Sequence, residues 1–167
     1  MILSPLDNPE LAPPNAVETG GISSPVPGGA VIADAFACPR DYLENRFVYT
    51  VVSPRAEGLS IGVNLNPDKE CNFDCVYCEI DRERRDLEAR LDLAGLADEL
   101  AATLAEAYSG ELRNRRCYRG LPAELLIPRH VALSGDGEPT LSERFEEVVE
   151  TVTHQRAVGD FPFFKIV

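Results

Sequence analysis

Hydrophobic residues along this chain occur either in short continuous runs or at intervals of three to four residues, and the two patterns alternate after residue 46. Short runs rich in β-branched and aromatic residues occupy 46–52, 59–65, 130–134 and 161–167. Ser-Pro, Asn-Pro and a Gly-rich stretch close the first three runs, as turn-forming residues do at the ends of strands. The pattern therefore predicts four β-strands.

Two longer segments repeat their hydrophobic residues every three or four positions, which is the spacing of one helix face. The first helix is predicted to begin after Asp92, whose carboxylate can cap it, and to end near Ser109-Gly110. The second is predicted to begin at about Ser142. The apolar stripes consist of Leu93, Leu96, Ala97, Leu100 and Leu104 in the first helix and of Phe145, Val148, Val149 and Val152 in the second.

The alternation of strands and helices predicts an α/β fold, in which parallel strands are joined by helical crossovers. In such sheets ligands bind at the carboxyl ends of the strands. The predicted folded part spans residues 46–167. Residues 1–45 are predicted to form an extended or poorly ordered segment, because Pro and Gly are frequent there and large apolar side chains are few.

Composition and charge narrow the possible partners. A hydrophobic fraction of 44 % in 167 residues is normal for one globular core. No segment approaches the roughly 20 apolar residues that span a bilayer and no signal peptide is visible, so we expect a cytoplasmic protein without membrane contact. The net charge is −12 and is spread evenly along the chain. Nucleic-acid binding is therefore not expected, because it depends on clustered Lys and Arg.

Cys71, Cys75 and Cys78 form a C-x-x-x-C-x-x-C motif in the loop after the second predicted strand. Three thiolates can hold three irons of a [4Fe-4S] cluster and leave the fourth iron open for chemistry, whereas electron-transfer clusters are closed by four ligands. A structural zinc site is the alternative, but it needs four donors and the motif supplies three. A disulfide framework is not expected, because the cysteine count of 5 is odd and three of them are crowded together.

The cysteine motif resembles the signature of the radical S-adenosylmethionine (radical SAM) enzymes. An aromatic residue just before the last cysteine, here Tyr77, is typical of that family and contributes contacts on the adenine side of the cofactor. A core aromatic beside the cluster is the alternative role for Tyr77. Ser53-Pro54-Arg55 and the segment 58–63 look more specifically like a subgroup of iron-sulfur oxidoreductases similar to the wybutosine-type tRNA-modifying enzymes.

A second segment strengthens the resemblance. Radical SAM enzymes carry a G-G-E-P segment at the end of their second strand, where it contacts the amino group of the methionyl moiety. The corresponding run here reads G-D-G-E-P, with Asp136 inserted and the matching residues Gly135, Gly137, Glu138 and Pro139. Both motifs follow strands that the pattern makes neighbours, so we expect them to converge on one site.

The resemblance implies the N-terminal part of a partial (β/α)6 barrel that binds a [4Fe-4S] cluster and S-adenosyl-L-methionine. It also implies a one-electron donor such as flavodoxin or ferredoxin. Reductive cleavage of the cofactor would release a 5′-deoxyadenosyl radical that abstracts hydrogen from a substrate, which the sequence does not identify. Two other functions stay open, namely a non-catalytic zinc or iron-sulfur module and a fragment of a tRNA-modifying radical SAM enzyme.

The predicted elements amount to about two β/α units and a third strand, whereas a radical SAM core usually has six units. We therefore expect a fragment of a longer enzyme or a truncated gene product. Cys38 and Cys117 are expected to be buried or incidental thiols, because neither has a partner at ligand spacing. His130 and His154 are expected to be structural rather than acid-base groups.

Overall fold

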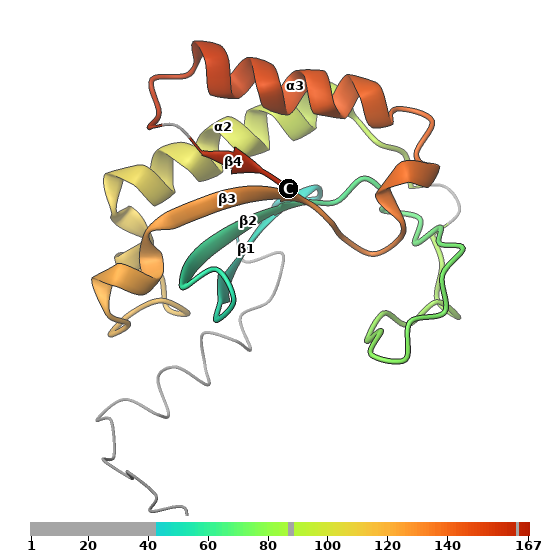
Figure 1. The fold of residues 1–167 in the computed structure, drawn as a ribbon, viewed down its shortest axis with the longest axis horizontal. Coiled ribbons are helices and arrows are strands. Elements are labelled where there is room, and N and C mark those ends of the chain that lie inside the picture. The colour runs from blue at the N-terminus through green and yellow to red at the C-terminus, as the bar shows by residue number, and fades with distance from the viewer. Residues whose placement is uncertain (1–42, 87–88, 163) are drawn as a thin grey trace, which may run out of the picture.

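The structure is a computed structural model that describes residues 43–86, 89–162 and 164–167. Within these ranges the chain forms a four-stranded sheet in the order β1-β2-β3-β4, with two long helices on one face (Figure 1). The strands are β1 (Val48–Ser53), β2 (Gly58–Val63), β3 (Pro128–Leu133) and β4 (Lys165–Ile166), and the helices are α2 (Leu93–Ser109) and α3 (Phe145–Val158). The predicted α/β class and the order of these elements are confirmed. The predicted segment 1–45 falls mostly outside the described residues and stays a prediction.

Helix α2 has the ends that its sequence predicts. The Asp92 carboxylate accepts a hydrogen bond of 3.1 Å from the backbone amide of Ala94, and Gly110 ends the helix with a φ of 79°. Helix α3 begins three residues later than predicted, at Phe145, and a 3-10 helix, η3 (Pro139–Leu141), precedes it. Glu138 caps η3 and Pro139 occupies its first turn, a position that proline favours.

The prediction of an all-parallel sheet is wrong at one edge. β2 pairs parallel with β3, and β3 with β4, but β1 pairs antiparallel with β2. The reason is the connection, because only residues 54–57 link β1 to β2 and a parallel crossover needs a dozen or more. The described residues thus form a mixed open sheet, and their place in a larger partial barrel stays a prediction.

The two faces of the sheet differ in chemistry. Alternate strand residues point toward the helices and are fully buried, including Val52, Ile61 and Val131, where they pack with the apolar stripes of α2 and α3. The opposite face carries no helix in the described ranges (Figure 1). Ser60, His130, Val51 and the buried ring of Tyr49 lie on that face, because side chains alternate along a strand. The sheet therefore has one hydrophobic face that the helices cover and a second face that carries more polar side chains; the second face is called the polar face.

The start of β1 is attached to α2 through one carboxylate. Glu99 accepts hydrogen bonds of 2.8–3.0 Å from the backbone amides of three successive residues, which are Arg46, Phe47 and Val48. Deeper in the core, the Thr50 hydroxyl lies 2.7 Å from the Tyr118 hydroxyl, and both residues are almost completely buried. These polar contacts fix the position of β1 against the helical layer.

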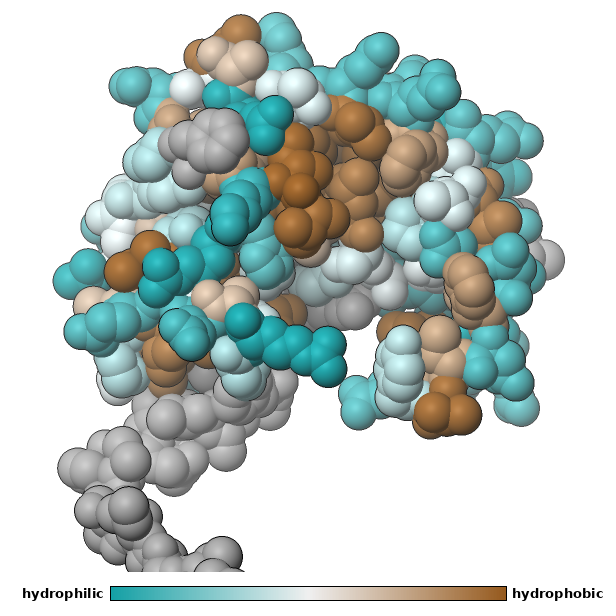
Figure 2. Space-filling model, viewed as in Figure 1, coloured by the Kyte–Doolittle hydropathy of each residue, from teal (hydrophilic) through white to brown (hydrophobic). Residues whose placement is uncertain are grey.

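The face of the molecule that Figure 2 shows is mostly hydrophilic, with a hydrophobic patch beside α3 and the C-terminal residues. Val167 contributes to the apolar surface of that end, being 61 % exposed. Among the described helices, none combines the length and the hydrophobicity needed to cross a bilayer.

Candidate functional site

Two loops at the carboxyl ends of β2 and β3 build the candidate site. The first loop leaves β2 through the buried residues Asn64 and Asn66 and carries the three cysteines of the motif. The second leaves β3 at Ser134 and carries the G-D-G-E-P segment into η3. Because β2 and β3 are parallel neighbours, both loops emerge at the same edge of the sheet.

The Asn64 side chain joins the two loops. Its amide nitrogen donates to the Asp136 carboxylate over 2.8 Å, and its carbonyl oxygen accepts from the backbone amide of Asp136 over 3.1 Å. The same carbonyl oxygen accepts from the backbone amide of Asn66, which shapes the first loop. A second connection is purely backbone, since the Glu138 amide donates to the Glu70 carbonyl over 3.0 Å. The loops are therefore held together by direct hydrogen bonds at two places.

Both glycines of the second motif are required by this close approach. A Cβ atom at Gly135 would lie 2.1 Å from the side-chain oxygen of Asn64, and one at Gly137 would lie 1.9 Å from the Glu70 carbonyl oxygen. Neither distance is compatible with a side chain, so glycine here serves close backbone contact between the loops.

The two motifs line a single hollow of about 370 Å³. All three motif cysteines border it together with Tyr77 and Arg82, and the other wall is formed by Leu133, Ser134, Gly135, Asp136, Gly137, Glu138 and Pro139. The structure thus confirms that the two motifs converge, although they lie in different loops of the sequence.

The three thiols are free but not equivalent. Cys71 and Cys75 are half-buried and Cys78 is exposed. The pKa of Cys78 is lowered by a hydrogen bond from the backbone of Ile80 and, secondarily, by the Arg82 guanidinium, whose nitrogen lies 3.4 Å from the Cys78 sulfur. Deprotonated thiol is the form that binds metals, so these contacts favour the ligating form of Cys78.

Arg82 is the cation of this site. Besides Cys78, its guanidinium donates to the backbone carbonyl of Phe73, which lies inside the cysteine loop. Its Nε atom is buried and has no hydrogen-bond partner among the described residues. A buried, unpartnered donor beside three thiols fits an anionic group held in the hollow.

The two carboxylates of the second motif already have partners. One oxygen of Glu138 accepts from both the backbone amide and the hydroxyl of Thr140, which makes this residue the cap of η3. Its other oxygen makes no hydrogen bond with the part of the chain that the structure describes. Asp136 is engaged by Asn64. Glu138 is therefore the carboxylate with an oxygen left for a ligand amine.

Tyr77 does not belong to the core. Its side chain is 81 % exposed, and the neighbouring Val76 and Phe73 are exposed as well. A hydrogen bond with the Cys75 side chain, followed by the charge of that thiol, raises the pKa of Tyr77. The alternative role of Tyr77 as a core aromatic is therefore wrong, and its position at the mouth of the hollow leaves its ring available to a ligand.

The donor chemistry of the site suits an iron-sulfur cluster, but the thiols are not gathered for one. Three free cysteines and a nearby cation line the same hollow. No three His, Cys, Asp or Glu side chains within the described ranges are close enough together to hold a metal ion. The cysteine loop would have to draw its thiols together on binding one.

Sequence reasoning missed three residues of the site, namely Asn64, Glu70 and Arg82. Asn64 could have been suspected, because a polar residue directly after an apolar strand often serves a loop. Glu70 acts through its backbone carbonyl and Arg82 lies in a charged stretch, so neither leaves a distinguishing signal in the sequence.

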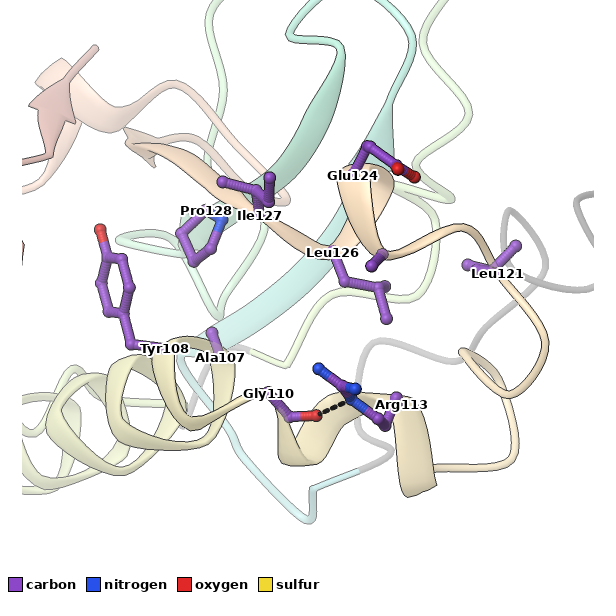
Figure 3. Close-up of a pocket in the computed structure, with 10 residues that line it drawn as sticks. Ala107, Tyr108, Gly110, Arg113, Leu121, Glu124, Leu126, Ile127 and Pro128 are labelled. Carbon is purple, nitrogen blue, oxygen red and sulfur yellow. Dashed lines mark hydrogen bonds between the residues drawn. The ribbon is translucent and has the colours of Figure 1, made fainter.

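A second hollow of about 500 Å³ lies at the other end of the sheet, between the C-terminal end of α2 and the beginning of β3 (Figure 3). Its walls are largely apolar, with Leu121, Leu126 and Ile127 on one side, and Arg113 donates a hydrogen bond to the Gly110 carbonyl. Among the described residues that line it there is no cysteine or histidine. Its lining offers no chemistry comparable to that of the cysteine loop.

The prediction for Cys117 is wrong. This residue is half-buried and disulfide-bonded, so it is not an incidental thiol. Disulfide partners that are distant in sequence cannot be deduced from spacing, which explains the error. Cys38 lies outside the described residues.

Comparisons with known proteins give distant relatives. The chain is 28 % identical to a UPF0026 protein of Helicobacter pylori over 106 residues, and 30 % identical to a UPF0026 protein of Methanocaldococcus jannaschii over 105 residues. These matches cover 63 % and 59 % of this chain but only 30 % and 27 % of the relatives. A match of 25 % identity over 122 residues to the GTPase Obg of Brachyspira hyodysenteriae covers 15 % of that protein.

No protein-family profile and no solved structure matches the chain. Its similarity to known proteins is therefore a distant one to UPF0026 proteins, of which it spans less than a third.

Proposed function

We propose that this chain carries the cofactor site of a radical SAM enzyme. Cys71, Cys75 and Cys78 would hold a [4Fe-4S] cluster, and S-adenosylmethionine would bind beside it against the 135–139 loop. The observation that carries the proposal is the convergence of the two motifs on one hollow. Either motif alone has simpler explanations, such as a zinc loop for the first and a strand-ending turn for the second.

The chain's own residues suit the tasks of such a site. The open oxygen of Glu138 can accept a charge-assisted hydrogen bond from the amino group of the cofactor. The exposed ring of Tyr77 can stack on or border its adenine. The guanidinium of Arg82 lies where it would offset the negative charge of a cluster bound by three thiolates.

When bound, the cluster and S-adenosylmethionine together supply a one-electron reductive cleavage that generates a carbon radical for hydrogen abstraction. The part of the protein is to hold and orient the cofactor. Asn64 contributes indirectly, because it keeps the two loops at the distance at which cysteines and Glu138 face the same hollow. A soluble one-electron donor such as flavodoxin or ferredoxin would deliver the electron.

The test is electron paramagnetic resonance of anaerobically reconstituted, reduced protein, recorded with and without S-adenosylmethionine. The proposal expects a [4Fe-4S] signal that shifts when the cofactor is added. Glu138→Gln should keep the cluster signal and weaken the shift, whereas Glu143→Gln, a change of the same kind at an exposed residue nearby, should leave both unaltered.

Three outcomes would contradict the proposal. A cluster signal that ignores the cofactor would indicate an iron-sulfur module without radical chemistry. Zinc bound in place of iron would indicate a structural metal site. If a variant with Cys75 and Cys78 replaced by Ser bound as much iron as the original protein, the cysteine motif would not be the ligand set.

A further inference from the structure

The polar face of the sheet carries a row of side chains that the proposed cofactor site does not use. Ser60 is the ladder partner of His130, and His130 is the ladder partner of Lys165. Paired residues of adjacent parallel strands point to the same side of a sheet, so a hydroxyl, an imidazole and an ammonium lie next to one another across β2, β3 and β4. The Ser60 hydroxyl oxygen is 2.8 Å from Nε2 of His130.

The burial of neighbouring residues shows that the row of Ser60, His130 and Lys165 lies on the face of the sheet without helices. The next residues along the three strands, Ile61, Val131 and Ile166, pack in the hydrophobic core with the helices. Because side chains alternate along a strand, the row faces away from α2 and α3. The described structure places no helix over it (Figure 1).

The next row of the sheet connects these side chains to the cysteine hollow. Gly62 and Ala132 are ladder partners there, and the missing side chain of Gly62 leaves room for the ring of Tyr49 from β1. The ring of Tyr49 lies against Gly62, where a Cβ atom would be 2.2 Å from the ring. The Tyr49 hydroxyl lies 3.1 Å from that of Ser134, which itself lines the hollow. The polar face thus leads to the edge where the two motifs meet.

We propose that Ser60, His130 and Lys165 bind the phosphate or carboxylate group of a small-molecule substrate. Lys165 is exposed and is the ladder partner of His130, so its ammonium can pair with an anion beside the ring. A protonated His130 can donate Nε2–H to the Ser60 oxygen, which leaves the Ser60 O–H and the Nδ1–H of the ring as donors to the anion. A nucleic acid is not the expected ligand, because the row contains one lysine in a chain of net charge −12.

The position of the row also limits the length of the substrate, a step that depends on the proposed function. Strand β3 rises by about 3.3 Å per residue, so the row at His130 lies roughly 13 Å from Ser134 at the hollow. A substrate whose anion binds at the row and whose reacting carbon reaches the hollow would therefore be about 13 Å long.

The test uses the full chain without any cluster, so it is independent of the cofactor. The sequence contains 2 histidines, and His154 is exposed on α3, so it serves as an internal control. Proton NMR of the imidazole signals is followed during titration with inorganic phosphate and, separately, with succinate at constant ionic strength. The proposal expects saturable shifts of the His130 signals while those of His154 follow only the bulk salt.

Substitutions test the contribution of each donor to phosphate binding. Lys165→Met should weaken phosphate binding about ten-fold and Ser60→Ala about three-fold, as expected for the loss of a charged and a neutral donor. Lys69→Met, at the only other lysine of the sequence, should change nothing. Preference for phosphate or for succinate would identify the source of the anion.

Equal shifts of both histidines, or unchanged phosphate affinity in both Lys165→Met and Ser60→Ala, would overturn the anion site. The phosphate titration involves no iron, so it tests the anion site independently of the cluster. Saturable phosphate binding together with a failed cluster reconstitution would contradict the proposed function but support the anion site. A reconstituted cluster that responds to S-adenosylmethionine, together with no phosphate binding, would contradict only the anion site.

Discussion

Replacing Gly137 by Ala should separate the two loops of the candidate site. The added Cβ would lie 1.9 Å from the Glu70 carbonyl oxygen, whereas real Cβ atoms essentially never come closer than 3.0 Å to a neighbour. The obstacle is backbone, which cannot rotate away as the end of a side chain can. The loops must therefore move apart by more than about 1 Å.

The magnitude follows from two costs. Moving the Glu70 carbonyl breaks its hydrogen bond with the Glu138 amide, and a backbone group left unpaired costs about 1–3 kcal/mol. Crowding in a packed region adds about 1–3 kcal/mol. Since the site is only half-buried, we expect the free energy of unfolding to fall by about 2–4 kcal/mol in total.

Urea denaturation followed by circular dichroism measures this change. With an m value of about 2 kcal/mol/M, the midpoint should fall by about 1–2 M while m stays constant. Gly95→Ala is the matched control, because its Cβ would come closer than 3.0 Å only to a carboxylate oxygen at the end of the Asp92 side chain, which can shift, and because Ala favours a helix over Gly by about 1 kcal/mol. Its midpoint should stay constant or rise. A loss below about 0.5 kcal/mol for Gly137→Ala would refute the argument that the glycine is required by loop contact.

Three further substitutions test other contacts. Glu99→Gln keeps the shape of the side chain but removes the charge shared by three backbone amides, and should cost about 1–2 kcal/mol in urea denaturation, in contrast to Glu146→Gln on the exposed side of α3. Tyr118→Phe removes the hydrogen bonds that the buried Tyr118 hydroxyl makes with the hydroxyl and the carbonyl of Thr50, and it should lower the free energy of unfolding by about 1–2 kcal/mol. A change under about 0.3 kcal/mol would contradict the importance of that pair. Arg82→Met should raise the pKa of the Cys78 thiol, because a cation that favours thiolate is lost. The measurement uses a protein in which the other two motif cysteines are replaced by Ser. The rate of alkylation of Cys78 should become lower at neutral pH and should rise only at higher pH. An unaltered dependence of this rate on pH would show that the guanidinium does not act on the sulfur.

Local signals in the sequence were sufficient for the individual elements. Asp92 and Gly110 mark the ends of α2 because capping depends on side chains and backbone conformations within one helical turn. The apolar stripe of that helix is buried as its periodicity predicts. The alternation of strands and helices predicted that the two strands preceding the motifs are neighbours in the sheet. The resulting prediction that the two motifs meet is confirmed.

Contacts between segments that are distant in sequence could not be predicted from local patterns. The antiparallel pairing of β1 with β2 depends on how a four-residue turn reverses the chain, and the composition of a strand is the same whether it pairs parallel or antiparallel. The disulfide of Cys117 likewise depends on which cysteines the fold brings together.

The sequence by itself determined the strands and helices, the cysteine motif and the position of the glycine-rich segment, because these are properties of neighbouring residues. Only the tertiary structure decided that Asn64 ties the two loops together, that Arg82 lies against Cys78, and that Ser60, His130 and Lys165 form one row. Each of these contacts joins different loops, turns or strands, and their geometry is set by sheet register and loop packing, which no short stretch of sequence encodes.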